Sequence, residues 1–177
     1  MQIEKVLEKA REIGFEDIGV VNVPALQFMP EVRDMCKSGR CRVYGKSWSC
    51  PPACGTIEEA AEKASAFTQG VLVQSVGHME DEFDGETMMD TEDLQKTRFA
   101  ELTEWLRGQG VDCLPMAAGT CRICKKCTYP DAPCRFPEKM YASMEAYGLW
   151  VSKVCEQAGR PYNHGKLTIA FVGCVLF

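Results

Sequence analysis

The chain has 177 residues, a net charge of −5 and eleven cysteines. This length suits one compact domain with its own core, so we expect a single domain over residues 1–177. No apolar run reaches the roughly 20 residues that cross a bilayer, and the first residues lack the apolar stretch of a signal peptide, so we expect a cytoplasmic protein with no membrane contact. Thiols stay reduced in the cytoplasm, where a cysteine-rich loop is more often a metal site than a disulfide framework.

Helices and strands are expected to alternate in the first half of the chain. Apolar residues at helical spacing end at Gly14, a natural helix stop, and Thr56 and Glu59 have the spacing of a capping box. The expected order is a helix, a strand, a short helix, a helix and a strand, at residues 1–13, 15–23, 24–39, 57–67 and 70–78.

The second half continues the alternation. We expect an exposed acidic connection, a helix, a strand, a helix opened by Pro137 and a final strand, at residues 79–90, 91–107, 111–119, 137–157 and 167–177. This order predicts an α/β fold, in which helices flank a mostly parallel sheet of about four strands. The loops that leave the carboxyl ends of parallel strands meet at one edge of the sheet, so the two cysteine-rich loops should be neighbours there, about 10 to 20 Å apart.

Four cysteines of the second loop lie within the stretch CRICKKCTYPDAPC, and they are Cys121, Cys124, Cys127 and Cys134. The first three are spaced three residues apart, and the fourth follows after a gap of six residues. Thiolates this close along the chain can each bind a different corner of a small iron-sulfur cube. Zinc prefers two well-separated pairs of cysteines, and the third thiol fits that pattern poorly. The spacing therefore favours a 4Fe-4S cluster, with zinc as the alternative.

Four cysteines of the first loop are more widely spaced, and they are Cys36, Cys41, Cys50 and Cys54. They can surround one ion or one cluster, and the eight-residue gap between Cys41 and Cys50 does not itself choose iron over zinc. We expect a second 4Fe-4S cluster here and keep zinc open as the other metal.

Positive charge gathers around both cysteine groups. Residues 33–54 and 121–139 together contain ten Lys and Arg against three Asp and Glu, although the whole chain is acidic. A thiolate-ligated cluster is anionic, and nearby cations lower the cost of holding that charge. An acidic protein without a broad basic face is not expected to bind nucleic acid.

The remaining cysteines and the two histidines are not assigned to a metal. Cys113, Cys155 and Cys174 fall in predicted strands or on a helix face and are expected to be small buried side chains. His78 and His164 are expected to face solvent.

Three pieces of the chain resemble a prokaryotic family described as predicted metal-binding proteins, a domain family of unknown function. The matching pieces are YGKSWSCPP at 44–52, CRICKKC at 121–127 and CRFPEKMYASMEAYG at 134–148. The resemblance implies that Cys50 and the four cysteines of the second loop are metal ligands. It implies no particular reaction.

Four cysteines per cluster would leave no iron open to a substrate, which suits one-electron transfer to a redox partner with an acidic docking face. One alternative is an iron-sulfur enzyme in which Cys36 or Cys54 is not a ligand, so that an open iron performs sulfur transfer or Lewis-acid chemistry. Another is a zinc-stabilised interaction module. The sequence does not decide whether the protein is itself a catalyst, and the oligomeric state stays open.

Overall fold

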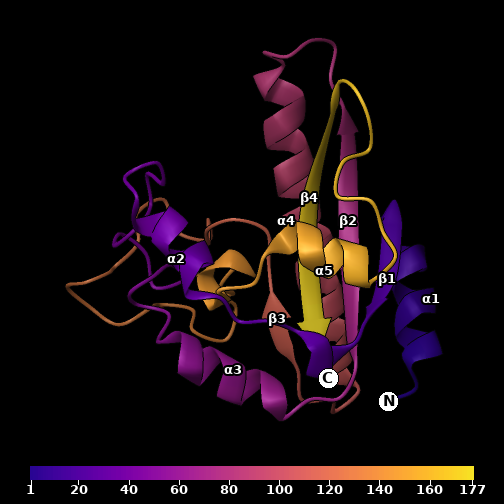
Figure 1. The fold of residues 1–177 in the computed structure, drawn as a ribbon, viewed down its shortest axis with the longest axis horizontal. Helices are drawn as coiled ribbons and strands as arrows, with labels where there is room; N and C mark the ends of the chain where they lie inside the picture. The colour runs from indigo at the N-terminus through magenta and orange to yellow at the C-terminus, as the bar shows by residue number, and fades with distance from the viewer.

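The computed structural model describes all 177 residues, with five α-helices and one four-stranded sheet (Figure 1). The helices are α1 Ile3–Ile13, α2 Pro30–Lys37, α3 Ile57–Ser65, α4 Gly85–Gly108 and α5 Val151–Gln157. The strands are β1 Asp17–Val21, β2 Gly70–His78, β3 Leu114–Met116 and β4 Thr168–Leu176. Two short 3-10 helices complete the list, η1 Val23–Ala25 and η2 Glu145–Tyr147.

Two helix boundaries form as the local sequence predicts. The helix α1 ends at Gly14, whose φ of 99° lies in the left-handed region that glycine adopts without strain. The helix α3 begins with a complete capping box, because the Glu59 N–H donates to the Thr56 hydroxyl at 3.1 Å and the Thr56 N–H donates to the Glu59 carboxylate at 2.7 Å. Both predictions are confirmed.

The sheet has the order β1-β2-β4-β3, and every neighbouring pair is antiparallel. The α/β class and the four strands are confirmed, but the prediction of a mostly parallel sheet is wrong. Strands joined through helices were expected to become parallel neighbours. Instead β4, the last strand of the chain, lies between β2 and β3 and runs opposite to both, so the strands that run in the same direction never pair.

The two faces of the sheet carry separate cores. Along β2, Val71 and Val73 pack with α1 and α4 on one face, and Leu72 between them packs with α3 and α5 on the other. This alternation is the two-residue period of a strand covered on both faces. Figure 1 shows α4 behind the sheet and α5 in front of it.

The predicted helix over 137–157 is wrong for most of its length. Residues 137–144 have no helix, η2 forms a single 3-10 turn, and only α5 matches the prediction. Gly148 interrupts the segment with a φ of 83°, in the left-handed region that glycine adopts without strain. A side chain at this position would also meet the backbone of Met29 at about 3.0 Å. The apolar residues of this segment are buried as expected, but they are buried in an irregular chain.

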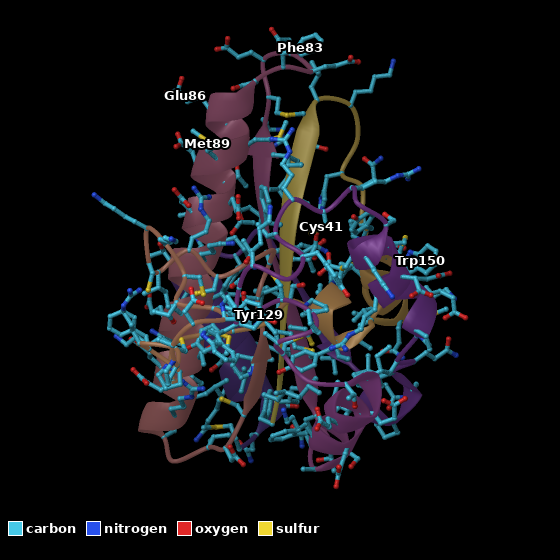
Figure 2. All side chains as sticks on the ribbon, turned by 90° about the vertical axis from the view of Figure 1, so that its left-hand side faces the viewer. Cys41, Phe83, Glu86, Met89, Tyr129 and Trp150 are labelled. Atoms are coloured by element: carbon cyan, nitrogen blue, oxygen red, sulfur yellow. The ribbon has the colours of Figure 1, made fainter.

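The helix α4 begins earlier than predicted, because the Asp84 carboxylate accepts a hydrogen bond from the Thr87 N–H at 3.0 Å and caps it. Half of the predicted acidic connection is therefore helical. Figure 2 shows Phe83, Glu86 and Met89 at one tip of the molecule, far from Cys41. None of the five helices has the length and apolar character needed to cross a membrane.

Candidate metal centre

The cysteine loops lie beside the β3 edge of the sheet, where α2 and the segments after α2 and after β3 come together (Figure 1). Cys36 lies in the last turn of α2, and the other seven candidate ligands lie in irregular chain. The first loop closes on itself through a hydrogen bond from the Gly45 N–H to the Pro51 carbonyl at 2.9 Å. Irregular chain lets side chains close in sequence point to a common centre.

The four cysteines of the second group line one cavity of about 420 Å³, and they are Cys121, Cys124, Cys127 and Cys134. Burial raises the pKa of Cys121, and the other three thiols raise it further because they lie close enough to repel its charge. The structure therefore brings together all four residues that the sequence predicts for this site.

Two features of the cavity favour thiolates. Burial alone would raise the pKa of Cys127, but hydrogen bonds from the backbone N–H groups of Tyr129 and Trp48 outweigh it, and the pKa is lowered. Cationic side chains also line the cavity, namely Lys46, Arg122, Lys125 and Arg135. Both features stabilise negative charge on the sulfur atoms, as an anionic metal centre requires.

Trp48 joins the first loop to the second. Its indole N–H donates to the Ala132 carbonyl at 3.1 Å, and its ring meets Tyr129 edge to face with centroids 5.0 Å apart. Because the indole also lines the cavity of the second group, it shields that cavity from water on one side.

Three cysteines of the first group line a second cavity of about 200 Å³, and they are Cys36, Cys41 and Cys50. Burial raises the pKa of Cys36, and the neighbouring charges of Cys41, Glu145 and Cys50 raise it further. These three thiols are therefore electrostatic neighbours, and Glu145 is the one carboxylate that joins them on the cavity wall.

Cys54 does not line this cavity. Its sulfur lies 3.3 Å from Nη2 of Arg33 and 3.6 Å from the carbonyl oxygen of Ala146, and it faces a different cavity of about 440 Å³ that contains Cys113. Burial raises the pKa of Cys54, and the Arg33 guanidinium opposes that rise. Of the eight predicted ligands, seven line the two cavities; Cys54 lines neither, although it lies close enough to Cys50 for the charge of that thiol to raise its pKa.

The two cysteine cavities adjoin at Thr120, which lines both of them. The Thr120 hydroxyl lies 3.2 Å from the sulfur of Cys50, and the Cys121 N–H donates to the Ser49 hydroxyl at 3.0 Å. The prediction that the two loops are neighbours is confirmed, although it rested on parallel strands that the sheet does not contain.

The donor atoms fit a metal group. The two cavities offer seven thiols, and those of the second group have backbone N–H donors and cations around them. Sulfur is the ligand that iron-sulfur clusters and zinc both take. No three Cys, His, Asp or Glu side chains meet closely enough, as they stand, to hold a single ion.

The remaining cysteines and the histidines lie away from these cavities. Cys113, Cys155 and Cys174 are buried as predicted. His164 bonds to the Gln74 side-chain oxygen at 2.9 Å, and His78 is exposed at the end of β2.

Sequence reasoning missed two residues of the site, Thr120 and Glu145, and it counted Arg33 only among the cations near the first group. Thr120 lies outside the cysteine spacing and carries no signal of its own. Glu145 lies in the piece CRFPEKMYASMEAYG, which carries the family resemblance. That resemblance was the one signal that could have marked Glu145 as a residue of the site.

Comparison with known proteins places the chain in one family. The family described as Predicted metal-binding protein (DUF2284) has a model that matches residues 19–177, and the chain belongs to it. The match covers both cysteine groups. No curated protein and no solved structure gives a significant match to the chain.

Proposed function

We propose that the protein binds two 4Fe-4S clusters, one at each cysteine group, and relays single electrons between redox partners in the cytoplasm. Each bound cluster would supply one-electron chemistry at a potential set by its surroundings. The observation that carries the proposal is the pair of adjoining cavities, one lined by four thiols and the other by three.

The spacing of the second group favours a cluster over a single zinc ion. Zinc prefers two well-separated pairs of cysteines, whereas Cys121, Cys124 and Cys127 follow one another at intervals of three residues. Four thiols on the wall of one cavity of about 420 Å³ suit a cluster with a separate iron for each thiolate.

The residues around the thiols have defined tasks in this proposal. Lys46 and Arg135 on the cavity wall offset the charge of an anionic centre, and the N–H groups near Cys127 lower its pKa and so favour the thiolate. Trp48 limits the access of water to the second cavity. Lys125 and Lys126 are exposed between the ligands, so they are placed to dock an acidic partner.

Metal analysis of anaerobically prepared protein tests the proposal. We expect about eight irons and eight sulfides per chain, and visible absorbance that bleaches with dithionite. Cys124→Ala should lose about four irons. The matched control Cys174→Ala, at a buried cysteine away from both cavities, should keep the full iron content. A colourless protein that contains only zinc would refute the proposal.

The docking face has its own test. Charge reversal in the double variant Lys125→Glu and Lys126→Glu should slow electron transfer to the anion ferricyanide and leave the iron content unchanged, because the basic rim would no longer attract a negative acceptor. The effect should fade at high salt. Equal rates of electron transfer for the variant and the parent at low salt would show that Lys125 and Lys126 do not dock the acceptor.

A further inference from the structure

The first cysteine cavity has three thiols and one carboxylate on its wall. Cys36, Cys41 and Cys50 face it together with Glu145, whereas Cys54 faces another cavity. Glu145 is close enough to Cys36 to act on its charge. It is solvent-exposed and makes no ion pair with any Lys or Arg, so its carboxylate is free to bind a metal beside the thiols.

The Cys54 sulfur contacts Arg33 and the carbonyl oxygen of Ala146, the residue after Glu145, and does not line this cavity. Arg33 donates to the Ala146 carbonyl from Nε at 2.8 Å and from Nη2 at 2.6 Å, and to the Gly55 carbonyl from Nη1 at 2.7 Å. Nη2 also lies 3.3 Å from the sulfur of Cys54. One guanidinium thus holds the carbonyls of Gly55, the residue after Cys54, and of Ala146, the residue after Glu145. It also places a charged N–H donor beside the Cys54 sulfur.

The chain on the far side of Cys54 is fixed as well. Gly55 takes a φ of 94° that only glycine adopts without strain, and Thr56 then begins α3 with a capping box. Cys54 is therefore followed at once by Gly55, whose carbonyl Arg33 holds, and by the capped start of α3. Turning the Cys54 sulfur toward Cys36 and Cys41 would break its contacts with Arg33 and with the Ala146 carbonyl, whereas Glu145 already lines their cavity.

We infer that the first cluster is bound by Cys36, Cys41 and Cys50 with the Glu145 carboxylate at its fourth iron, and that this iron exchanges its carboxylate for a small, soft anionic ligand. The inference rests on the proposed pair of clusters. A carboxylate is a harder donor than a thiolate and holds a soft metal centre less firmly, so a cyanide or thiolate ion displaces it. Tyr44 and Ser143 line the same cavity and provide hydroxyl groups beside the incoming ligand.

The test uses iron counts and electron paramagnetic resonance spectra of the anaerobic, dithionite-reduced protein. Cys54→Ala should keep about eight irons, whereas the matched variant Cys36→Ala should fall to about four. Potassium cyanide should change the spectrum of one cluster in the parent protein. Glu145→Gln should keep its iron, alter the same signal before cyanide is added and bind cyanide about tenfold more tightly, because no carboxylate competes.

The outcomes separate this inference from the proposed function. A Cys54→Ala protein that folds normally but loses about four irons overturns the inference and leaves the two clusters in place. If that variant does not fold, cyanide titration of the parent protein decides, and a spectrum that does not respond overturns the inference. A parent protein without iron ends the proposed function itself.

Discussion

Arg33 offers the sharpest test of how the first site is held. Its guanidinium satisfies the carbonyls of Ala146 and Gly55, and Ala146 is only 3% exposed. Arg33→Met removes the charged donors of both carbonyls and leaves Ala146 with only the weak thiol donor of Cys54 at 3.6 Å. Each buried group without an adequate partner costs about 1 to 3 kcal/mol. Because water reaches Gly55 more easily than Ala146, we expect a loss of about 3 kcal/mol in the free energy of unfolding.

The measurement is the apparent melting temperature of the anaerobic protein, followed by far-ultraviolet circular dichroism at one heating rate. A chain of 177 residues shifts by about 2 to 4 °C per kcal/mol, so Arg33→Met should melt about 6 to 12 °C lower. Arg33→Lys should show part of this fall in melting temperature, because one ammonium group does not reproduce the planar fork of a guanidinium.

The matched control is Arg160→Met. Arg160 is exposed and makes one ion pair, to Asp17 at 3.3 Å, which is worth no more than about 1 kcal/mol. Its melting temperature should fall by less than about 4 °C. If Arg33→Met and Arg160→Met have the same melting temperature, the Arg33 guanidinium does not anchor the segments around Gly55 and Ala146. Cys54 is then not fixed outside the first cavity by Arg33.

Three further predictions concern other parts of the molecule. Thr120→Val removes the hydroxyl beside the Cys50 sulfur, so one cluster should show a lower midpoint potential in a redox titration, with no loss of iron. Gly173→Ala places a methyl group 2.7 Å from the ring of Phe99, so urea unfolding should report a loss of about 1 to 3 kcal/mol. Burial raises the pKa of Cys155 to about 11, so iodoacetamide should not label it in the folded protein at pH 9.

Controls for these predictions lie within the chain. A methyl group added by Gly108→Ala meets no atom within 4 Å and should not destabilise the protein, whereas a loss of stability equal to that of Gly173→Ala would argue against crowding at Phe99.

The raised pKa of Cys155 means that the folded protein keeps a proton that the unfolded chain releases, so stability should fall as the pH rises from about 9 to 11. Rapid labelling of Cys155 at pH 9, or a flat stability profile in that range, would contradict the burial argument.

The sequence predicted those elements whose signals are local. The stop at Gly14 and the capping box of α3 depend on residues at most four positions apart, and both formed as expected. The direction of the strands depends on which strands become neighbours. That choice was decided by β4, which follows β3 by more than 50 residues and enters the sheet between β2 and β3. No local pattern in β2 or β3 contains that information.

The wrong helix over 137–157 has a different cause. Met144 and Tyr147 are buried, so the apolar spacing reported burial correctly. Spacing cannot distinguish a helix from an irregular segment that is buried on one side. Here Gly148 and the close approach of Met29 favour the irregular segment, and they do so through a contact between residues more than 100 positions apart.

The same distinction applies to the metal centre. Close spacing predicted that the four thiols of the second group would gather, and they do. The position of Cys54 is set by Arg33 on α2 and by the Ala146 carbonyl on η2, two elements that the spacing of the cysteines does not describe. Spacing therefore identified which residues are candidates, and the contacts between elements decided where each one faces.

Those contacts also explain how irregular loops can present ligands in fixed positions. The Trp48 indole bonds to Ala132, the Ser49 hydroxyl accepts from Cys121, and Arg33 joins α2 to η2. Each of these bonds links two segments that carry candidate ligands, and none of them involves a metal. Because the protein supplies this order itself, metal binding has less chain to order.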